Sequence, residues 1–370
     1  MLNFSQLVAL EHSLRGTRVL SVYLDGTASD PAQQRAWRVQ LDHSLDDLRV
    51  WLTGSPHAER EDFEQCVRLL DHELEAFTGN VEAHGWAAFI TADRLHEASP
   101  LPVTMPTQAV WSTGISMAPY MRALKEIRPV AIVLVDSKRA DVNRYYRGKL
   151  EHIETLHAYH TVMQPSHMGD APRPGFHSGT RGATGHDEAQ ESLLAGTNRM
   201  LADAAERAMH VAGAEGWIVT GGIPKVGRQL AERLSSRARD RILNVESLDI
   251  HASKADLAEA ARVGASTLRN AMDAARIAEI ADSGGATGLG ALGPAATRET
   301  LDQRRVRDLF LTHRYLENHA AEAEDAVRSA IDQGAMVEEV SGAAAEQLDA
   351  HGGMAARLRY RVESNSGITP

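Results

Sequence analysis

A short stretch near the middle of the chain, PGFHSGTRGATGHDEAQ (residues 174–190), is rich in small and polar residues. Gly175, Gly179, Gly182 and Gly185 follow one another closely in it, and Gly196 lies just beyond. A glycine has no Cβ, so its backbone adopts positive φ and approaches a ligand closely, and threonine hydroxyls both donate and accept hydrogen bonds. The stretch predicts a glycine-rich loop over residues 174–186 that either meets a ligand or is a flexible connection.

Histidines gather around the same stretch, and the group is His152, His157, His160, His167, His177 and His186. On a helix His152 and His160 would share a face, and His157 and His160 are three residues apart, so a metal site is geometrically conceivable. No His-Glu-x-x-His spacing accompanies them. We therefore expect solvated loop histidines, no metal and no cofactor, and keep a small metal-dependent hydrolase as an alternative.

A basic segment, DSKRADVNRYYRGKLEH, precedes the glycines and carries Lys138, Arg139, Arg144, Arg147 and Lys149, with two tyrosines among them. On a strand Arg139 and Arg147 would share one face while Arg144 pointed to the other. The segment is interpreted either as a solvated strand edge or as a patch that contacts RNA.

Two other features are weaker candidates for sites of chemistry. TGGIPKVG (Thr220 to Gly227) follows a strand and precedes a helix, where a helix N-terminus with Lys225 nearby would hold an anion, but a tight strand-to-helix turn is the favoured interpretation. Cys66 lies on the apolar face of an expected helix and is interpreted as a buried structural thiol. No Gly-x-Ser-x-Gly motif is present.

The composition limits the class of protein. The chain has 370 residues, 43% of them hydrophobic and 24% charged, which predicts a globular, soluble protein of two or three domains. A formal net charge of −11 argues against an autonomous binder of nucleic acid, including DNA. The single cysteine excludes a disulfide framework. With no apolar span and no export signal at the start, we expect a cytoplasmic protein without a membrane partner.

Strand and helix patterns alternate along the chain. Arg18 to Asp25, Gly85 to Ala92 and Arg128 to Asp136 are aliphatic runs typical of buried strands. Helices are expected from Asp30 onward, over residues 60–77, and from His186 or Asp187 to Gly213. The further elements expected are a hairpin strand at 140–150, strands at 215–222, 241–250, 306–312 and 335–342, and helices at 224–238, 253–284 and 317–333. A short helix is expected to start at Pro294, and a last strand is expected in 351–360.

This order predicts an α/β fold of three small domains with mixed sheets flanked by helices. The expected divisions are a divergent N-terminal α/β domain at 1–125, a middle α/β domain at 126–252 that contains the glycine-rich loop, and a linking helix with a C-terminal α/β domain at 253–370.

The C-terminal residues carry a family resemblance. GLGALGPAATRETLDQRRVRDLFLT, GAMVEEV and HGGMAARLRY, with Gly352, Gly353 and Tyr360 in the last, resemble the third domain of archaeal and eukaryotic class-I peptide release factors and of Pelota. The middle domain is similar in placing a glycine-rich loop between a strand pair and a long helix. The chain as a whole resembles the bacterial relatives of these proteins, the bacterial archaeo-eukaryotic release factor family that includes Balon-like proteins.

In the release factors this loop carries Gly-Gly-Gln, whose glycines let the backbone approach the 3′ end of peptidyl-tRNA and whose glutamine helps to place a water against the ester. Aligning that motif here gives Arg181, Gly182, Ala183, Thr184 and Gly185, with alanine for the second glycine and threonine for the glutamine. The resemblance implies Gly182, Ala183 and Thr184 as the residues at the reaction centre. It implies binding roles for Gly179, Thr180, Arg181 and Gly185, beside the basic residues Arg139, Arg144, Arg147 and Lys149.

The resemblance implies a ribosome-associated translation factor whose loop enters the peptidyl-transferase region for rescue, hibernation or a termination-like action. The implied partners are large-subunit ribosomal RNA, the tRNA 3′ end and a translational GTPase. Because the tip is Gly-Ala-Thr, binding is favoured over chemistry, and peptidyl-tRNA hydrolysis is kept as an alternative.

Overall fold

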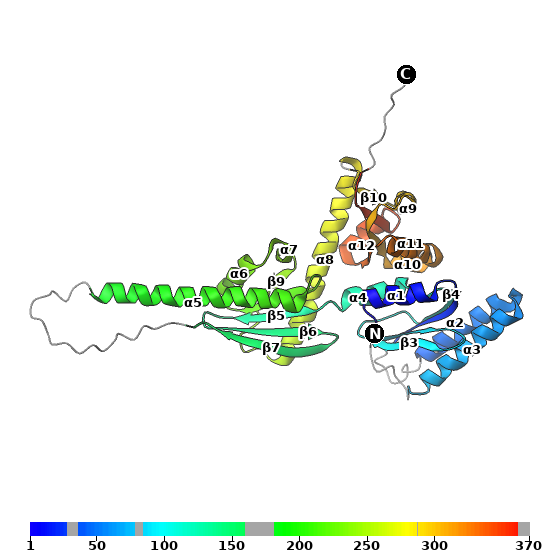
Figure 1. Ribbon diagram of the computed structural model, residues 1–370, viewed down its shortest axis with the longest axis horizontal. Coiled ribbons are helices and arrows are strands. Elements are labelled where there is room, and N and C mark those ends of the chain that lie inside the picture. The colour runs from blue at the N-terminus through cyan, green and yellow to red at the C-terminus, as the bar shows by residue number, and fades with distance from the viewer. Residues whose placement is uncertain (28–35, 78–83, 160–180, 287, 362–370) are drawn as a thin grey trace, which may run out of the picture. The chain divides into compact units, whose positions relative to one another are not determined.

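The computed structural model describes residues 1–27, 36–77, 84–159, 181–286 and 288–361 (Figure 1). Its contacts divide the chain into two compact units. Unit 1 contains Met1–Ile127 and Asp273–Pro370, and unit 2 contains Arg128–Met272. Three sheets flanked by helices confirm the mixed α/β class. The finer division into three domains, with boundaries after residues 125 and 252, stays a prediction.

The first sheet of unit 1 is antiparallel throughout, in the order β3-β2-β1-β4. Its strands are β1 (Arg18–Asp25), β2 (Gly85–Ile90), β3 (Leu95–Leu101) and β4 (Gln108–Thr113). The neighbouring helices are α1 (Phe4–Leu14), α2 (Ala36–Trp51), α3 (His57–Leu74) and α4 (Ala118–Glu126), with the 3-10 turn η2 (Leu52–Gly54). Leu20 and Val22 of β1 pack in the core with α2 and α3, whereas Val19 and Tyr23 pack with α1 and α4, so both faces of the sheet are covered.

The second sheet of unit 1 has the order β10-β13-β11-β12, and only β11 and β12 are parallel. Its strands are β10 (Gly290–Leu292), β11 (Val306–Thr312), β12 (Met336–Val340) and β13 (Met354–Leu358). Its helices are α9 (Pro294–Asp302), α10 (His313–Asn318), α11 (Ala320–Asp332) and α12 (Gly342–Asp349). Ile277 and Ile280, from the last part of α8 (Lys254–Ala286), pack against this sheet.

One hydrophobic core joins the two sheets of unit 1. Tyr23, Phe89 and Tyr120 from the N-terminal segment lie in the same buried cluster as Leu309 and Val327 from the C-terminal segment. Burying this apolar surface together is favourable. The two ends of the chain therefore fold as one unit although unit 2 separates them in the sequence.

A buried ion network stabilises the same interface. The ammonium group of Lys125, at the end of α4, donates to both carboxylate oxygens of Asp273 at 2.8 Å and to the Glu339 carbonyl oxygen at 2.6 Å. The Lys125 and Asp273 side chains are only 5% and 1% exposed. The Glu338 carboxylate lies 3.5 Å from Lys125 and 2.8 Å from Arg276. The charges are thus paired out of water, as buried charges must be.

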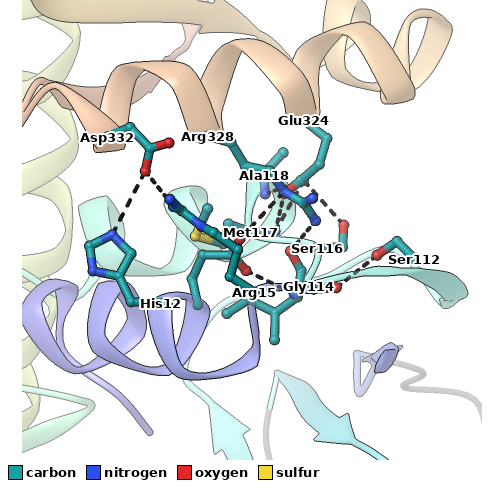
Figure 2. A network of polar contacts seen from close by, with 12 residues as sticks. His12, Arg15, Ser112, Gly114, Ser116, Met117, Ala118, Glu324, Arg328 and Asp332 are labelled. Carbon is teal, nitrogen blue, oxygen red and sulfur yellow. Dashed lines mark hydrogen bonds and ion pairs between the residues drawn. The ribbon is translucent and has the colours of Figure 1, made fainter. Parts of the chain in front are cut away.

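A second network links α1, α4 and α11 (Figure 2). Glu324 of α11 accepts hydrogen bonds from the Met117 and Ala118 backbone amides at the start of α4. Glu11 of α1 accepts one from the Ile115 amide at 2.9 Å. Arg328 donates to the Ile115 carbonyl oxygen at 3.0 Å, and its Nε lies 3.4 Å from Glu324 and 3.7 Å from Glu11. One guanidinium therefore compensates two largely buried carboxylates.

Unit 2 is built on a five-stranded sheet in the order β7-β6-β5-β8-β9. Its strands are β5 (Val130–Val135), β6 (Arg139–Tyr146), β7 (Lys149–His157), β8 (Trp217–Gly222) and β9 (Ile242–Asn244). Its helices are α5 (Arg181–Ala212), α6 (Pro224–Arg233), α7 (Ser236–Arg239) and the first part of α8. Ala131 and Val133 of β5 pack with α5, and Ile132 and Leu134 pack with α8. This alternation explains why β5 is aliphatic throughout.

None of the described helices combines the length and the apolar character needed to cross a bilayer.

Cys66 is fully buried in α3, as its place on the apolar face predicts, with its Sγ 3.7 Å from the Ile90 carbonyl oxygen. Burial, with smaller contributions from nearby carboxylates, raises the pKa of the thiol to about 12. The thiolate is the reactive form, so we expect a disulfide reagent at pH 8 to modify the native protein roughly a thousandfold more slowly than urea-unfolded protein. Equal rates in the two states would contradict this placement.

Candidate functional site: the α5 end and the basic hairpin

Helix α5 extends beyond the sheet on which it packs (Figure 1). Within residues 191–212 of α5, the first buried residue is Gly196, and Leu193 and Leu194 are 47% and 57% exposed. At about 1.5 Å per residue, the part of α5 that precedes Gly196 is roughly 22 Å long. Thr197 anchors the base of this projection, because its hydroxyl donates to the Ser137 carbonyl oxygen at 2.8 Å in the turn between β5 and β6.

The start of α5 corrects the sequence-based boundary of the loop. The helix was expected to begin at His186 or Asp187, but it begins at Arg181, so the predicted tip residues Arg181, Gly182, Ala183, Thr184 and Gly185 lie in its first turns. Glycine and threonine are poor helix formers, which is why their run predicted a loop. Gly179 and Thr180 lie outside the described residues, and the roles of all seven residues stay predictions.

The basic segment forms a tight hairpin at the edge of the sheet. Arg147 and Gly148 connect β6 to β7 and have φ of 51° and 74°, the positive values that a two-residue hairpin turn requires. The guanidinium carbons of Arg144 and Arg147 lie 4.8 and 5.0 Å from the centre of the Tyr146 ring. Two cations on one aromatic ring, with Lys149 exposed beside them, form a surface suited to phosphates and bases.

The expected faces of this segment were wrong. Arg147 was expected to share a strand face with Arg139, but it lies in the turn and contacts Tyr146 together with Arg144. Arg139 lies at the other end of β6 and pairs with Asp141 at 2.9 Å. A strand of the length of β6 spans roughly 27 Å. The structure therefore brings Arg144, Arg147 and Lys149 together but leaves Arg139 apart from them.

The two parts of the candidate site lie at opposite ends of unit 2. The β5–β6 turn, which contacts Thr197, marks the end from which α5 projects. The Arg147–Gly148 turn lies at the far end of β6, where Val130 of β5 pairs with Tyr145. A partner that contacted both would have to extend along the whole sheet.

The two histidines at 152 and 157 lie on a strand, so they are not placed on the helix that the metal-site alternative assumed. His152 lies in strand β7, with its Nδ1 3.1 Å from Asn143 Oδ1 and its Nε2 3.2 Å from Thr155 Oγ1. His157 ends the same strand. His160, His167 and His177 lie outside the described residues. Within the part of the chain that the structure describes, no group of three potential metal ligands occurs.

The turn at Thr220–Gly227 has a structural explanation. The Gly222 amide donates to the Leu248 carbonyl oxygen at 2.7 Å, and the Ile223 amide donates to the Val135 carbonyl oxygen at 2.9 Å. Gly222 has φ of 91°, and a Cβ there would lie 2.3 Å from the Val135 oxygen. The strand-to-helix turn thus requires this glycine and uses these amides internally, as the favoured interpretation of the motif expected.

A cavity at the base of the projection was not anticipated from the sequence. It has a volume of about 300 Å³ and lies between β7 and α5, with Glu154, His157, Tyr159, Arg199 and Asp203 among its lining residues. Tyr159 is 80% exposed. Charges of both signs beside an exposed ring offer polar contacts and stacking rather than an acid–base pair. The signal for it in the sequence was Tyr159, two residues after the end of β7.

One segment of the chain matches a known protein family. Residues 116–265, which include β5 to β9 and α5, match the model of the bacterial archaeo-eukaryotic release factor family 10. This segment is thus similar to the bacterial archaeo-eukaryotic release factors of family 10, and the match does not extend to the rest of the chain. A comparison with curated proteins finds no match.

Several solved structures are similar to the chain. Archaeoglobus fulgidus Pelota is 13% identical, with 75% of this chain and 80% of that chain covered and a TM-score of 0.37. Archaeal Pelota, from a model of ribosome-bound Pelota and ABCE1, is 15% identical over 98% of this chain and 96% of that chain, with a TM-score of 0.43. S. cerevisiae Dom34, a translation termination-like factor that interacts with Hbs1, is 12% identical over 64% of each chain, with a TM-score of 0.42.

Proposed function

We propose that this chain is a ribosome-associated translation factor of the release-factor type, which carries the glycine-rich segment 174–186 to the peptidyl-transferase region of the large subunit. The match of residues 116–265 to a release factor family carries the proposal, because that segment contains the glycines, α5 and the basic hairpin. The projection of α5 supports it, since a helix is a rigid spacer on which to carry a tip away from the body of unit 2.

The residues at the tip favour occupation of the site over hydrolysis. Ala183 lies in the first turns of α5, and alanine is the best helix former. A loop that required positive φ at this position would disfavour alanine, whereas the helix does not. A threonine at position 184 has a shorter side chain than glutamine and a different set of donors and acceptors. Rescue or hibernation by site occupation is therefore the preferred action, with the tRNA 3′ end and ribosomal RNA as neighbours.

Co-sedimentation tests the proposal. Purified protein is pelleted with 70S ribosomes through a sucrose cushion, beside a variant in which residues 179–185 are replaced by a serine linker. We expect wild-type pelleting that weakens at least tenfold in the variant. Failure of the wild type to pellet at low salt, with vacant and with tRNA-loaded ribosomes, would overturn the proposal. Release of labelled peptide from P-site tRNA in the same complexes would show that hydrolysis accompanies binding.

The basic hairpin has its own predicted effect on this binding. Replacing Arg147 and Lys149 by glutamine removes two exposed cations, and each lost phosphate contact lowers the slope of log affinity against log salt by about 0.7–0.9. We expect weaker ribosome binding at every salt concentration and a slope reduced by about 1.5. The matched control replaces Arg237 and Lys254, two exposed cations of unit 2, and an equal effect there would show that only net charge matters.

A further inference from the structure

Strand β4 forms one edge of the first sheet of unit 1, and among the described hydrogen bonds of β4, Ser44 of α2 contacts this edge only at Ala109. It is the last strand in the order β3-β2-β1-β4 and pairs with β1 in an antiparallel ladder. No other described strand pairs with its outer edge. An open edge presents backbone amides and carbonyls in the arrangement that another extended chain needs.

The register identifies the peptide groups that face outward. The Gly114 amide donates to the Thr17 carbonyl oxygen at 2.9 Å, so residue 114 faces β1. Hydrogen bonding to one neighbour alternates along an antiparallel strand, which turns the peptide groups of Thr113, Trp111 and Ala109 away from β1. The hydroxyl of Ser44 in α2 accepts a hydrogen bond from the Ala109 amide at 2.9 Å. This contact confirms that the Ala109 amide points away from β1. Trp111 and Thr113 are left as the outward-facing pair.

A groove runs beside these two residues. It has a volume of about 470 Å³, and its walls are β4, the start of α4, and α10 with α11. Val110 and Ser112 line it from the strand, Pro119 from α4, and Leu316, Ala320 and Ala321 from α10 and α11. The size lies within the roughly 300–1,000 Å³ of binding pockets, and the small residues on α11 leave room for the side chains of an added strand.

The charge of the groove indicates which kind of segment it binds. Arg328 already compensates the carboxylates of Glu11 and Glu324. Asp325, one residue further along α11, is exposed and lines the groove, and no described cation lies within ion-pair distance of it. The groove therefore has an excess of negative charge, which a lysine or arginine of the occupant would neutralise.

We propose that the groove beside β4 binds an extended, basic segment of a partner protein, which adds as a strand to Trp111 and Thr113 and places a cationic side chain at Asp325. Backbone hydrogen bonds supply the affinity of such strand addition, and alternate side chains supply its specificity. This site lies in unit 1 and is independent of the ribosomal role proposed for the α5 end.

Fluorescence anisotropy on the full chain tests the proposal with a labelled heptapeptide of alternating lysine and valine, KVKVKVK. One comparison peptide has N-methyl groups on alternate backbone nitrogens, which remove the donors of one edge, and another is the acidic EVEVEVE. A labelled ten-nucleotide oligouridine is the nucleic-acid probe. We expect binding of KVKVKVK in the micromolar range and at least tenfold weaker binding of both comparison peptides and of the RNA.

Variants locate the site. Asp325→Lys removes the carboxylate from an exposed position, and the matched control Asp302→Lys makes the same charge change on α9. Thr113→Pro removes one outward amide, a substitution that an edge strand tolerates. We expect Asp325→Lys and Thr113→Pro to weaken KVKVKVK binding at least tenfold and Asp302→Lys to leave it unchanged. Unfolding midpoints of all three variants show whether each is folded. Absence of peptide binding, insensitivity to N-methylation or to Asp325→Lys, or tighter binding of the RNA would each overturn the proposal.

Discussion

Replacement of Lys125 by methionine is expected to lower the free energy of unfolding of unit 1 by about 3–5 kcal/mol. The Lys125 ammonium group makes two 2.8 Å contacts with the Asp273 carboxylate, and both side chains are buried. Without the cation, Asp273 keeps only the Ser341 amide, at 3.4 Å, among its described hydrogen-bond donors. Burial already raises the pKa of Asp273, and Lys125 opposes that rise, so its loss leaves a charge with little compensation.

Urea unfolding followed by tryptophan fluorescence measures this loss, because Trp37, Trp51, Trp86 and Trp111 lie in unit 1 and only Trp217 lies in unit 2. The double variant Lys125→Met/Asp273→Leu should recover most of the stability, since apolar residues often replace a buried ion pair without loss. Arg94→Met, which removes an exposed partner of Asp93, should leave the midpoint unchanged. A loss below about 1 kcal/mol in the single variant would contradict the account of this interface.

Replacement of Arg328 by methionine is expected to cost about 3 kcal/mol at pH 8 and clearly less at pH 5. Burial raises the pKa of both Glu11 and Glu324, and Arg328 lowers both. In the variant both folded-state pKa values rise further. A carboxyl whose pKa is raised on folding adds to the free energy of unfolding at a pH below its unfolded-state pKa. This contribution is lost as the pH rises through the folded-state pKa. The deficit of the variant must therefore grow from pH 5 to pH 8.

Unfolding curves of wild type and variant at the two pH values test this sign. Arg328→Lys is the control, because it keeps a cation near the two carboxylates and should show a smaller deficit with less dependence on pH. A deficit of the same size at pH 5 and pH 8 would show that lost packing, and not the carboxylates of Glu11 and Glu324, accounts for the effect.

The buried strands could be predicted from the sequence to within a residue or two. The expected bounds of β1 and β11 are those observed, Arg18–Asp25 and Val306–Thr312. A short aliphatic run bounded by polar residues is typical of a buried strand in a globular chain. The start of α8 was also predicted to within a residue, at 253 against the observed Lys254. The Ser253 hydroxyl accepts from the Asp256 amide at 3.2 Å, as an N-cap residue should.

Elements whose residues depend on tertiary partners were missed. Helix α1 begins with a capping box between Asn3 and Gln6, but Glu11 on its inner face looks solvent-exposed until Arg328 is placed beside it. Strand β7 mixes Glu, His and Thr and has no clear alternation, since its polar residues pair across the ladder, as Thr155 does with Asp141. Local propensity gives no indication of either partner.

Local sequence patterns could not predict that the two ends of the chain fold together in unit 1. It depends on contacts such as Lys125 with Asp273 and Glu324 with the Met117 amide, between residues far apart in the chain. The same limitation affected the candidate site. Its residue types were recognised, but the placement of Arg147 in a left-handed turn and of Thr184 in a helix follows from how the sheet and α5 are built.

Tethered cleavage from the end of α5 would test the central proposal, that this end reaches the peptidyl-transferase region, most directly. Thr184→Cys introduces a thiol for an iron chelate, and the native Cys66 is buried with a raised pKa, so the label goes to the new position. The labelled protein is bound to 70S ribosomes with P-site tRNA, and hydroxyl radicals are generated. Lys254→Cys, at the start of α8, carries the same label as the control.

We expect the Thr184→Cys label to cleave large-subunit ribosomal RNA at the peptidyl-transferase centre and the tRNA near its 3′ end, and the Lys254→Cys label to cleave elsewhere. Ribosome-bound protein whose Thr184→Cys label gives no cleavage at that centre, or the same pattern as the control, would contradict the proposed function.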